Sequence, residues 1–340
     1  MTTFTPINKV KFHQLIAKFR TIQADFLREF DVNDIFSNSK IYEILIANEL
    51  NHTLIPGHSG SKDAKDNKGT YEYKHFKETS SNHSWTFNDY SDNTISNLAL
   101  SEGVIFAHIN DTVFPAVLDW YIYVDAKICS QYLKNRTTDL LQRQPKGKPN
   151  ARRMINISAK QLETDLQVTK INIASPKQQG KYVKWLDNLY NLSKDLEKCT
   201  NVINILTSNK IWEVLVAVEL GHNVNSEQGG RAGGHDAYDV NGDVYEYKVS
   251  KTRAWKFQDI SENVLEKYKD DKAIILAVVD KTFMTTTAIY SANPAKVVVR
   301  LREKLKEKEE NYAKKGKKIK RKEISLGKKD LKKIDATQIL

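Results

Sequence analysis

Apolar and polar residues follow two different periods along this chain, and the order of the two periods is the same in each half. Apolar residues at helical spacing predict helices over Phe12–Phe30 and Tyr182–Leu196. A further segment, Lys40–Asn51, is apolar around most of its helical circumference. We therefore expect this helix to pack against a sheet rather than to face water.

Shorter segments after these helices predict a hairpin, another helix and a buried strand in each half. The second hairpin carries Asn241-Gly242 between two strand-like segments, a strong short-range hairpin signal. The expected hairpin strands are Asp63–Asp66 with Thr70–Lys74, and Asp236–Val240 with Val244–Lys248. The following helices and strands are expected over Phe87–Leu98 and Val104–Ile109, and over Phe257–Lys269 and Ile274–Val279. This order predicts an α/β domain with a mixed β-sheet flanked by helices.

The two halves are similar in sequence as well as in pattern. The segment Lys40–His52 recurs as Lys210–His222, with eight of 13 positions identical at an offset of 170. The four residues from Tyr71 recur unchanged from Tyr245, and five of the nine residues from Trp85 recur from Trp255. The 340 residues are therefore interpreted as two tandem copies of one domain, residues 1–170 and 171–340.

The positive charge of the chain is concentrated at its C-terminal end. Of the net charge of +11, the segment Arg300–Lys333 supplies +10, from 16 basic and 6 acidic residues. A smaller basic stretch, Arg143–Lys160, occupies the matching place in the first copy. Clustered Lys and Arg favour a polyanion such as nucleic acid because binding releases counterions, although a solvated helix has the same composition.

Several classes of protein are disfavoured by composition. No apolar run approaches the roughly 18 residues of a membrane span, and the N-terminal segment lacks the apolar core of a signal peptide. With only Cys129 and Cys199, neither a disulfide framework nor a zinc site is expected, so we predict a cytoplasmic protein without a membrane partner. The glycine-rich loop Gln228–Gly234 is not followed by Gly-Lys-Ser/Thr, which argues against a P-loop.

Candidate chemistry lies on the two hairpins. Glu246 and Lys248 are two residues apart on a strand and share one face, and Asp236 lies on the adjoining strand. The first copy has Asp63, Glu72 and Lys74 in the same places. Two neighbouring carboxylates suit Mg²⁺, which can polarise a phosphodiester and activate a bound water, and the lysine can orient that water. Ion pairs at a strand edge are the simpler alternative.

The choice of aspartate is open at this stage. Asp66 and Asp239 lie near the hairpin turns, and in a tight hairpin Asp239 would directly oppose Glu246. We favour Asp63 and Asp236.

This pattern resembles the Asp…(Asp/Glu)-x-Lys motif of the PD-(D/E)xK nuclease superfamily, which includes many type II restriction endonucleases. The resemblance covers Lys40–Ile109 and Lys210–Val279, and Lys62 and His235 stand where the motif often has proline. It implies two tandem restriction-endonuclease-like domains that bind Mg²⁺ through Asp63, Glu72, Asp236 and Glu246. It also implies catalytic roles for Lys74 and Lys248 and for the acidic residues of the leading helices, Glu43 and Glu213.

The resemblance implies a site-specific endonuclease for double-stranded DNA. Each copy would cut one strand, so that a monomer acts as a pseudodimer, and a DNA methyltransferase acting on the same site would be its partner. Two alternatives remain: a repair or structure-specific nuclease or nickase, and a non-catalytic DNA-binding protein that keeps the fold.

Overall fold

A computed structural model describes residues 7–37, 39–56, 62–88, 91–142, 154–203, 205–207, 209–225, 235–316, 319 and 322–340. The chain forms two compact units. The first-copy unit comprises Ile22–Ile35 and Ser39–Asn191, and the second-copy unit comprises Met1–Thr21, Phe36–Asn38 and Leu192–Leu340. Two long helices, α1 (Lys9–Phe30) and α6 (Val183–Thr200), contribute residues to both units.

The units therefore do not follow the copy boundary at residue 170. Tyr182 belongs to the first-copy unit, where its backbone N–H donates to Asn48 Oδ1 at 3.1 Å and its hydroxyl accepts from the backbone N–H of Leu54 at 3.0 Å. The start of α1 belongs to the second-copy unit, where Lys9 Nζ donates to the carbonyl of Glu219 at 3.2 Å. The start of α1, from the first copy, thus lies in the second-copy unit, and the start of α6, from the second copy, lies in the first-copy unit.

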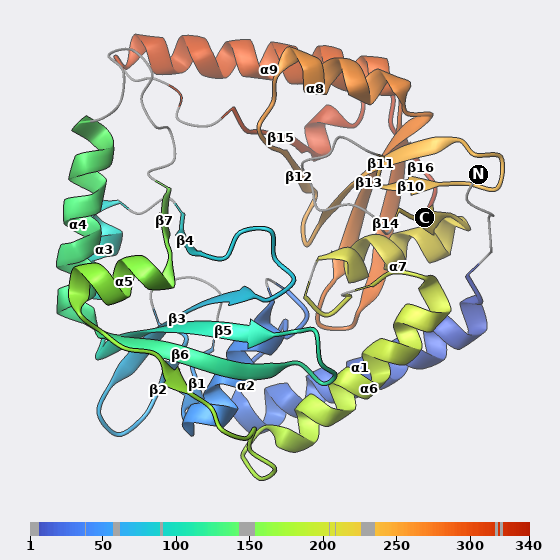
Figure 1. Ribbon diagram of the computed structural model, residues 1–340. Helices are drawn as coiled ribbons and strands as arrows, with labels where there is room; N and C mark the ends of the chain where they lie inside the picture. The colour runs from blue at the N-terminus through green and yellow to red at the C-terminus, as the bar shows by residue number, and fades with distance from the viewer. Residues whose placement is uncertain are drawn as a thin grey trace. The chain divides into compact units, whose positions relative to one another are not determined.

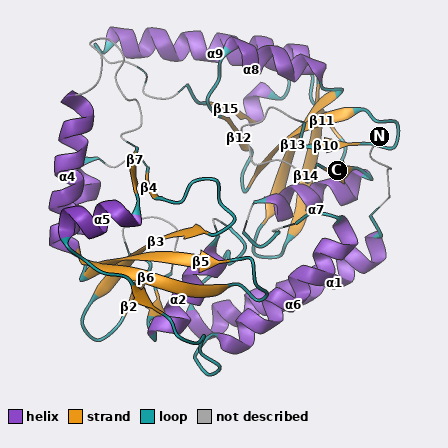
Figure 2. Ribbon diagram, viewed as in Figure 1, coloured by secondary structure: helices purple, strands orange, loops and turns teal. Residues whose placement is uncertain are grey.

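The first-copy unit is a mixed six-stranded sheet with helices on both faces (Figures 1 and 2). Its strand order is β1-β2-β3-β5-β6-β8, and only the β3–β5 pair is parallel. Its strands are β1 (Thr53–Leu54), β2 (Ala64–Lys65), β3 (Thr70–Lys77), β5 (Gly103–Asn110), β6 (Val117–Asp125) and β8 (Ile171–Asn172). A separate pair is formed by β4 (Trp85–Phe87) and β7 (Ile155–Ile157), and the helices are α2 (Lys40–Leu50), α3 (Asp92–Leu98), α4 (Ala126–Gln142) and α5 (Ala159–Leu166).

The second-copy unit repeats this arrangement. Its six-stranded sheet has the order β9-β10-β11-β13-β14-β16, with β11 and β13 parallel. The strands are β9 (Asn223–Val224), β10 (Ala237–Tyr238), β11 (Val244–Ser250), β13 (Ala273–Asp280), β14 (Thr285–Ala292) and β16 (Thr337–Gln338), with a separate pair of β12 (Ala254–Phe257) and β15 (Ile324–Gly327). The helices are α7 (Lys210–Leu220), α8 (Glu262–Lys267), α9 (Pro294–Lys314) and the short 3₁₀ turns η1 (Tyr268–Asp270) and η2 (Lys328–Asp330). The predicted mixed α/β architecture with two similar sheets is confirmed.

The expected helices over Phe87–Leu98 and Phe257–Lys269 are wrong at their starts. The first residues of both segments are extended, because Trp85–Phe87 pairs with β7 and Ala254–Phe257 pairs with β15. Each helix begins only after a serine whose hydroxyl accepts a backbone N–H three residues later, Ser91 for α3 and Ser261 for α8.

Two tryptophans anchor equivalent cores. Trp85 and Trp255 are fully buried, and their Nε1 atoms donate to the carbonyls of Ala107 and Ala277, each at 2.9 Å. Each ring is part of the hydrophobic core of its own unit. No helix within the described ranges is long and apolar enough to cross a bilayer.

Candidate active site

The first hairpin brings its three candidate residues together. The β2–β3 register pairs Ala64 with Tyr71, which places Asp63 opposite Glu72. The backbone N–H of Asp63 donates to the Tyr71 carbonyl at 2.8 Å, and Asp63 Oδ2 accepts the backbone N–H of Tyr73 at 2.7 Å. Lys74 Nζ forms an ion pair with Glu72 Oε1. The strand pair alone therefore positions Asp63, Glu72 and Lys74.

The second hairpin reproduces this geometry. Ala237 pairs with Tyr245, so Asp236 lies opposite Glu246. Asp236 Oδ2 accepts the backbone N–H of Tyr247 at 2.8 Å, and Lys248 Nζ pairs with Glu246 Oε1. The same three contacts in both copies follow from the same register, because an antiparallel pair fixes which side chains face each other.

The alternative aspartates have a different local role. Asp66 Oδ1 accepts the backbone N–H groups of Lys68 and Gly69, at 2.8 and 3.1 Å. Asp239 accepts from the backbone N–H groups beyond it in the same way, and its own N–H donates to the Asp243 carbonyl at 3.0 Å. Asp239 is therefore opposite Asp243, and the expectation that it could oppose Glu246 is wrong. Both side chains cap the hairpin turns.

The acidic residues of the leading helices lie in the same electrostatic environment. Burial, with the nearby charge of Asp63 as the second cause, raises the pKa of Glu43 to about 7 against the opposing effect of Lys40. Burial likewise raises the pKa of Glu213 to about 7, with Asp236 as the second cause. The helices α2 and α7 thus add one buried carboxyl group to each hairpin.

The motif glutamates are equally perturbed. Burial raises the pKa of Glu72 to about 7; Lys74 opposes this rise and Asp63 adds to it. The pKa of Glu246 is also raised to about 7 by burial, against the effect of Lys248. Strongly perturbed carboxyl groups clustered around a lysine are a common feature of catalytic and metal-binding sites.

Two further lysines belong to these clusters and were not singled out from the sequence. Lys40 is only 2% exposed and forms an ion pair with Glu43 across one helical turn. Lys210 Nζ lies 2.5 Å from Glu213 Oε2 and 3.9 Å from Asp236 Oδ1. The available signal was the identical start of the repeated helix, Lys-Ile-aromatic-Glu, which places lysine and glutamate three residues apart on one helix face.

Each hairpin offers two carboxyl groups to a divalent cation. Glu72 Oε2 is buried and has no hydrogen-bond partner among the described atoms, while Oε1 is held by Lys74. Within the described residues, no group of three His, Cys, Asp or Glu side chains is arranged to hold a metal ion. A pair of carboxylates fits Mg²⁺ better than zinc, because Mg²⁺ retains several waters and needs few protein ligands.

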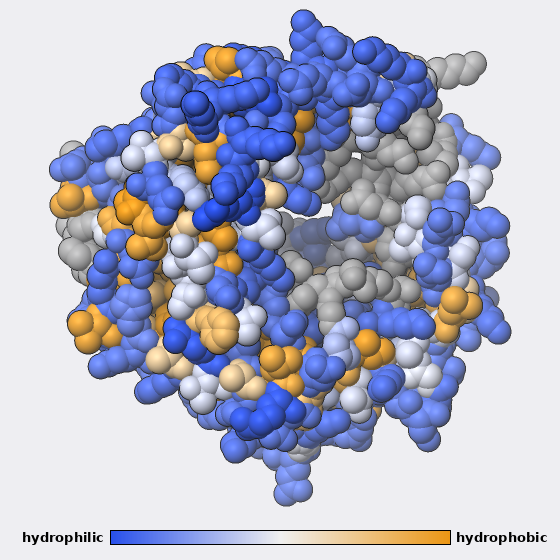
Figure 3. Space-filling view, turned by 180° about the vertical axis from the view of Figure 1, so that it is seen from behind, coloured by the Kyte–Doolittle hydropathy of each residue, from blue (hydrophilic) through white to orange (hydrophobic). Residues whose placement is uncertain are grey.

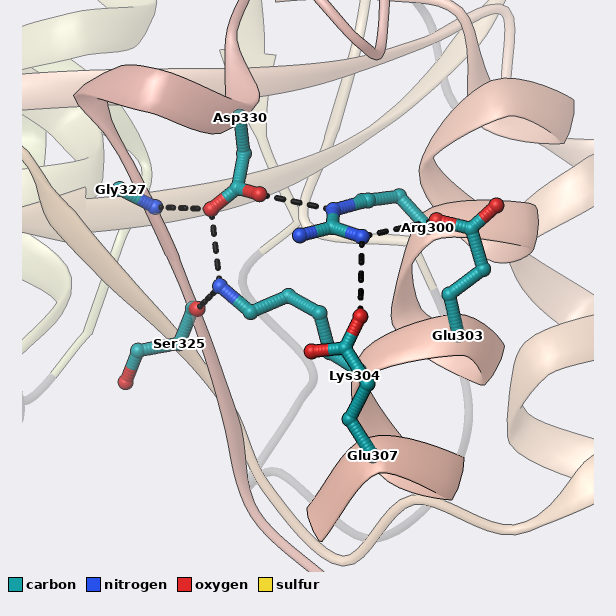
Figure 4. Close-up of polar contacts among 7 residues, drawn as sticks. All are labelled: Arg300, Glu303, Lys304, Glu307, Ser325, Gly327 and Asp330. Carbon is teal, nitrogen blue, oxygen red and sulfur yellow. Dashed lines mark hydrogen bonds and ion pairs between the residues drawn. The ribbon is translucent and has the colours of Figure 1, made fainter.

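The basic C-terminal segment is partly used within the fold. Arg300 Nε and Lys304 Nζ each lie 2.8 Å from the carboxylate of Asp330, which is 5% exposed (Figure 4). Arg302 pairs with Glu262 and Glu266 of α8, at 2.6 and 2.7 Å. These side chains stabilise the packing of α9.

Other lysines of the segment face solvent. The surface along α9, at the top of Figure 3, consists almost entirely of hydrophilic side chains. Exposed lysines on α9 and after it include Lys296, Lys306, Lys314, Lys315, Lys322, Lys328, Lys329, Lys332 and Lys333. In the first copy most of the stretch Arg143–Lys160 lies outside the described residues, as does the glycine-rich loop from Gln228.

Comparison with known proteins adds no assignment. No protein-family model matches this sequence, and no curated protein matches it at a significant level. The residues of the two hairpins are therefore the basis for assigning a function.

Proposed function

We propose that this protein is a Mg²⁺-dependent DNA endonuclease of the PD-(D/E)xK type, built as a single-chain pseudodimer of two restriction-endonuclease-like domains. The observation that supports this most directly is the repetition of one hairpin geometry. In both copies an aspartate faces a glutamate across two strands, and a lysine two residues later pairs with that glutamate.

The residues have distinct roles in this proposal. Asp63 with Glu72, and Asp236 with Glu246, would hold Mg²⁺, which supplies Lewis-acid activation of a phosphodiester and of water. Lys74 and Lys248 would orient the attacking water and balance the charge that develops on the phosphate oxygens. Glu43 and Glu213, paired with the buried Lys40 and the half-buried Lys210, would orient the cluster from the helix side.

The substrate in this proposal is double-stranded DNA. Two similar sites in one chain suit the two strands of a duplex, and the exposed lysines on and after α9 would contact backbone phosphates. The divergence of the two copies allows an asymmetric recognition sequence as well as a palindromic one.

The decisive experiment is cleavage of supercoiled plasmid with Mg²⁺. The unmodified protein should give linear product, while Lys74→Ala and Lys248→Ala should each give nicked circles, with opposite strands cut. Loss of the lysine should slow its own site by on the order of 100-fold or more, because it removes a charge that acts in the transition state. Two exposed lysines, Lys65 and Lys267, provide matched Ala controls that should cut like the unmodified protein.

The outcomes separate the alternatives. Discrete fragments indicate a restriction enzyme, and cuts confined to mismatches or junctions indicate a structure-specific nuclease. A gel shift without any cleavage would refute the enzymatic proposal. Loss of both cuts in either single variant would refute the independence of the two sites.

A further inference from the structure

A cavity of about 430 Å³ lies beside the candidate site of the second-copy unit. Its walls come from the start of α7, from the end of β11 with the loop to β12 and β12 itself, and from the end of β13 with Lys281 after it. Glu213 and Lys248 of the candidate site form part of the wall. A ligand in this cavity would therefore be next to the reacting groups.

The cavity is basic. Four lysines line it, Lys248, Lys251, Lys256 and Lys281, and one acid, Glu213, is among the lining residues. Outside the lining, Glu246 and Glu323 pair with Lys248 and Lys256. The carboxyl group of Glu213 is itself paired with Lys210. Hydroxyl groups from Ser250 and Thr252 add further donors to the wall. Such a lining attracts an anion with several oxygen atoms.

Lys281 is held against the wall by its surroundings. Its Nζ lies 4.8 Å from the centre of the Trp212 ring and hydrogen-bonds to Ser37 Oγ. The Trp212 side chain is only 2% exposed, so the aromatic surface under the ammonium group is fixed. A lysine supported in this way loses less conformational entropy on binding an anion than a lysine that extends freely into water.

The first copy has the opposite charge at the position equivalent to Lys281. Asp111 occupies the place of Lys281, one residue after the equivalent strand, and its side chain is 8% exposed. Asp111 accepts two hydrogen bonds from Thr79, at 3.0 and 2.6 Å, and lies 3.3 Å from the Nζ of Lys77. Lys77 is the counterpart of Lys251, so the first copy places an acid beside this lysine where the second copy has Lys281.

A second acid reinforces this difference. Glu78 stands where the second copy has Thr252, and its carboxylate lies 2.8 Å from His108 Nε2. Burial favours a higher pKa for Asp111, but the Thr79 hydrogen bonds and Lys77 outweigh it and lower the pKa, so this group is a carboxylate at neutral pH. The first site therefore has two acids where the second has a lysine and a threonine.

We propose that the cavity of the second-copy unit is a subsite for a backbone phosphate of DNA adjacent to the scissile bond, and that the first copy lacks it. This inference rests on the proposed nuclease function and specifies it. A DNA duplex would bind more tightly at the second site, where Lys251 and Lys281 contact the phosphate. The two strands would therefore be cut at unequal rates.

The test measures binding, not cleavage. A fluorescent 30-base-pair duplex of random sequence is titrated with the full chain in EDTA, over a series of salt concentrations. Each phosphate contact to B-DNA contributes about 0.9 to the slope of log K against log salt, so Lys281→Asp should lower that slope by about one. Its affinity should fall by roughly tenfold at low salt. Lys251→Ala is a second, milder variant that should lower the slope similarly.

Lys267→Asp on α8 is the matched control, since Lys267 is an exposed lysine of the same unit that does not line the cavity. A thermal melt shows that each variant is folded. If Lys281→Asp and Lys251→Ala both bind as the control does, or if the unmodified chain does not bind DNA at all, the subsite is refuted. If the unmodified chain cuts plasmid but the two variants keep its salt slope, the subsite alone is refuted. If the variants lower the slope as expected but the unmodified chain does not cut, only the nuclease function is refuted.

Discussion

Replacing Asp330 with asparagine removes a buried negative charge on which two basic side chains of α9 converge. Asp330 accepts from Arg300 Nε at 2.8 Å, from Lys304 Nζ at 2.8 Å and from the backbone N–H of Gly327 at 2.9 Å (Figure 4). Burial by itself favours a higher pKa for this carboxyl group, but these three donors lower the pKa to about 2.

The shift from the ordinary pKa gives the size of the effect. A folded-state pKa of about 2 against about 3.8 in the unfolded chain is worth roughly 2 kcal/mol at neutral pH, after some allowance for solvent screening. Because the folded-state pKa is depressed, this contribution is complete above about pH 5. It decreases to about half by about pH 3 and disappears near about pH 1.

The assay is thermal unfolding of the full chain at pH 7 and at pH 3. Asp330→Asn should lower the melting temperature of the second-copy unit by about 4–8 °C at pH 7, and by about half as much at pH 3. Asp335→Asn is the matched control, because Asp335 pairs with Lys296 of the same helix but is 60% exposed. Its φ of 48° is a conformation that asparagine also tolerates.

The control should shift the melting temperature by little, since an exposed ion pair contributes about 0–1 kcal/mol. Equal shifts for the two variants at pH 7 would show that the buried network carries no more free energy than a surface pair. If the loss of melting temperature in Asp330→Asn is as large at pH 3 as at pH 7, its cause is not the carboxylate charge.

Two further predictions concern other parts of the fold. A Cβ at residue 103 would lie 2.2 Å from the Tyr123 ring, so Gly103→Ala should destabilise the first-copy unit by about 1–2 kcal/mol in urea unfolding. Adding Tyr123→Ser should restore most of the lost stability, because the second copy has Ala273 and Ser291 at the equivalent positions. A double variant as unstable as Gly103→Ala alone would contradict the steric explanation. Burial raises the pKa of Cys129 to about 12, so iodoacetamide at pH 8 should label only Cys199 in the native chain, as mass spectrometry can check. Labelling of Cys129 at a comparable rate would contradict its burial.

Residue pattern alone predicted much of the architecture. The repeat placed α2 and α7 and the buried strands β5 and β13 within one or two residues, because each is a long segment with one clear period. The strands β4 and β12 were missed, since their partners β7 and β15 follow some 70 residues later and no local pattern marks the pairing.

Local periodicity determines only part of the candidate site. Alternation along a strand puts Glu72 with Lys74, and Glu246 with Lys248, on one face wherever the strand lies. The choice between Asp236 and Asp239 depended on the register, because a hairpin with a longer turn slides one strand past the other. Lys40 and Lys210 required the helix to be docked, since only packing against the hairpin buries a lysine beside a glutamate.

The sequence by itself determined that one domain occurs twice, and that each copy carries an aspartate, a glutamate and a lysine on hairpin strands. Both are local properties, which depend on identity and spacing along the chain. The folded arrangement was needed to show that Arg300 and Lys304 form ion pairs with Asp330. It was also needed to show that Lys281 lies beside the second site and that Asp111 pairs with Lys77 in the first copy. Those outcomes depend on which distant segments meet, because electrostatic interaction acts through space and not along the sequence.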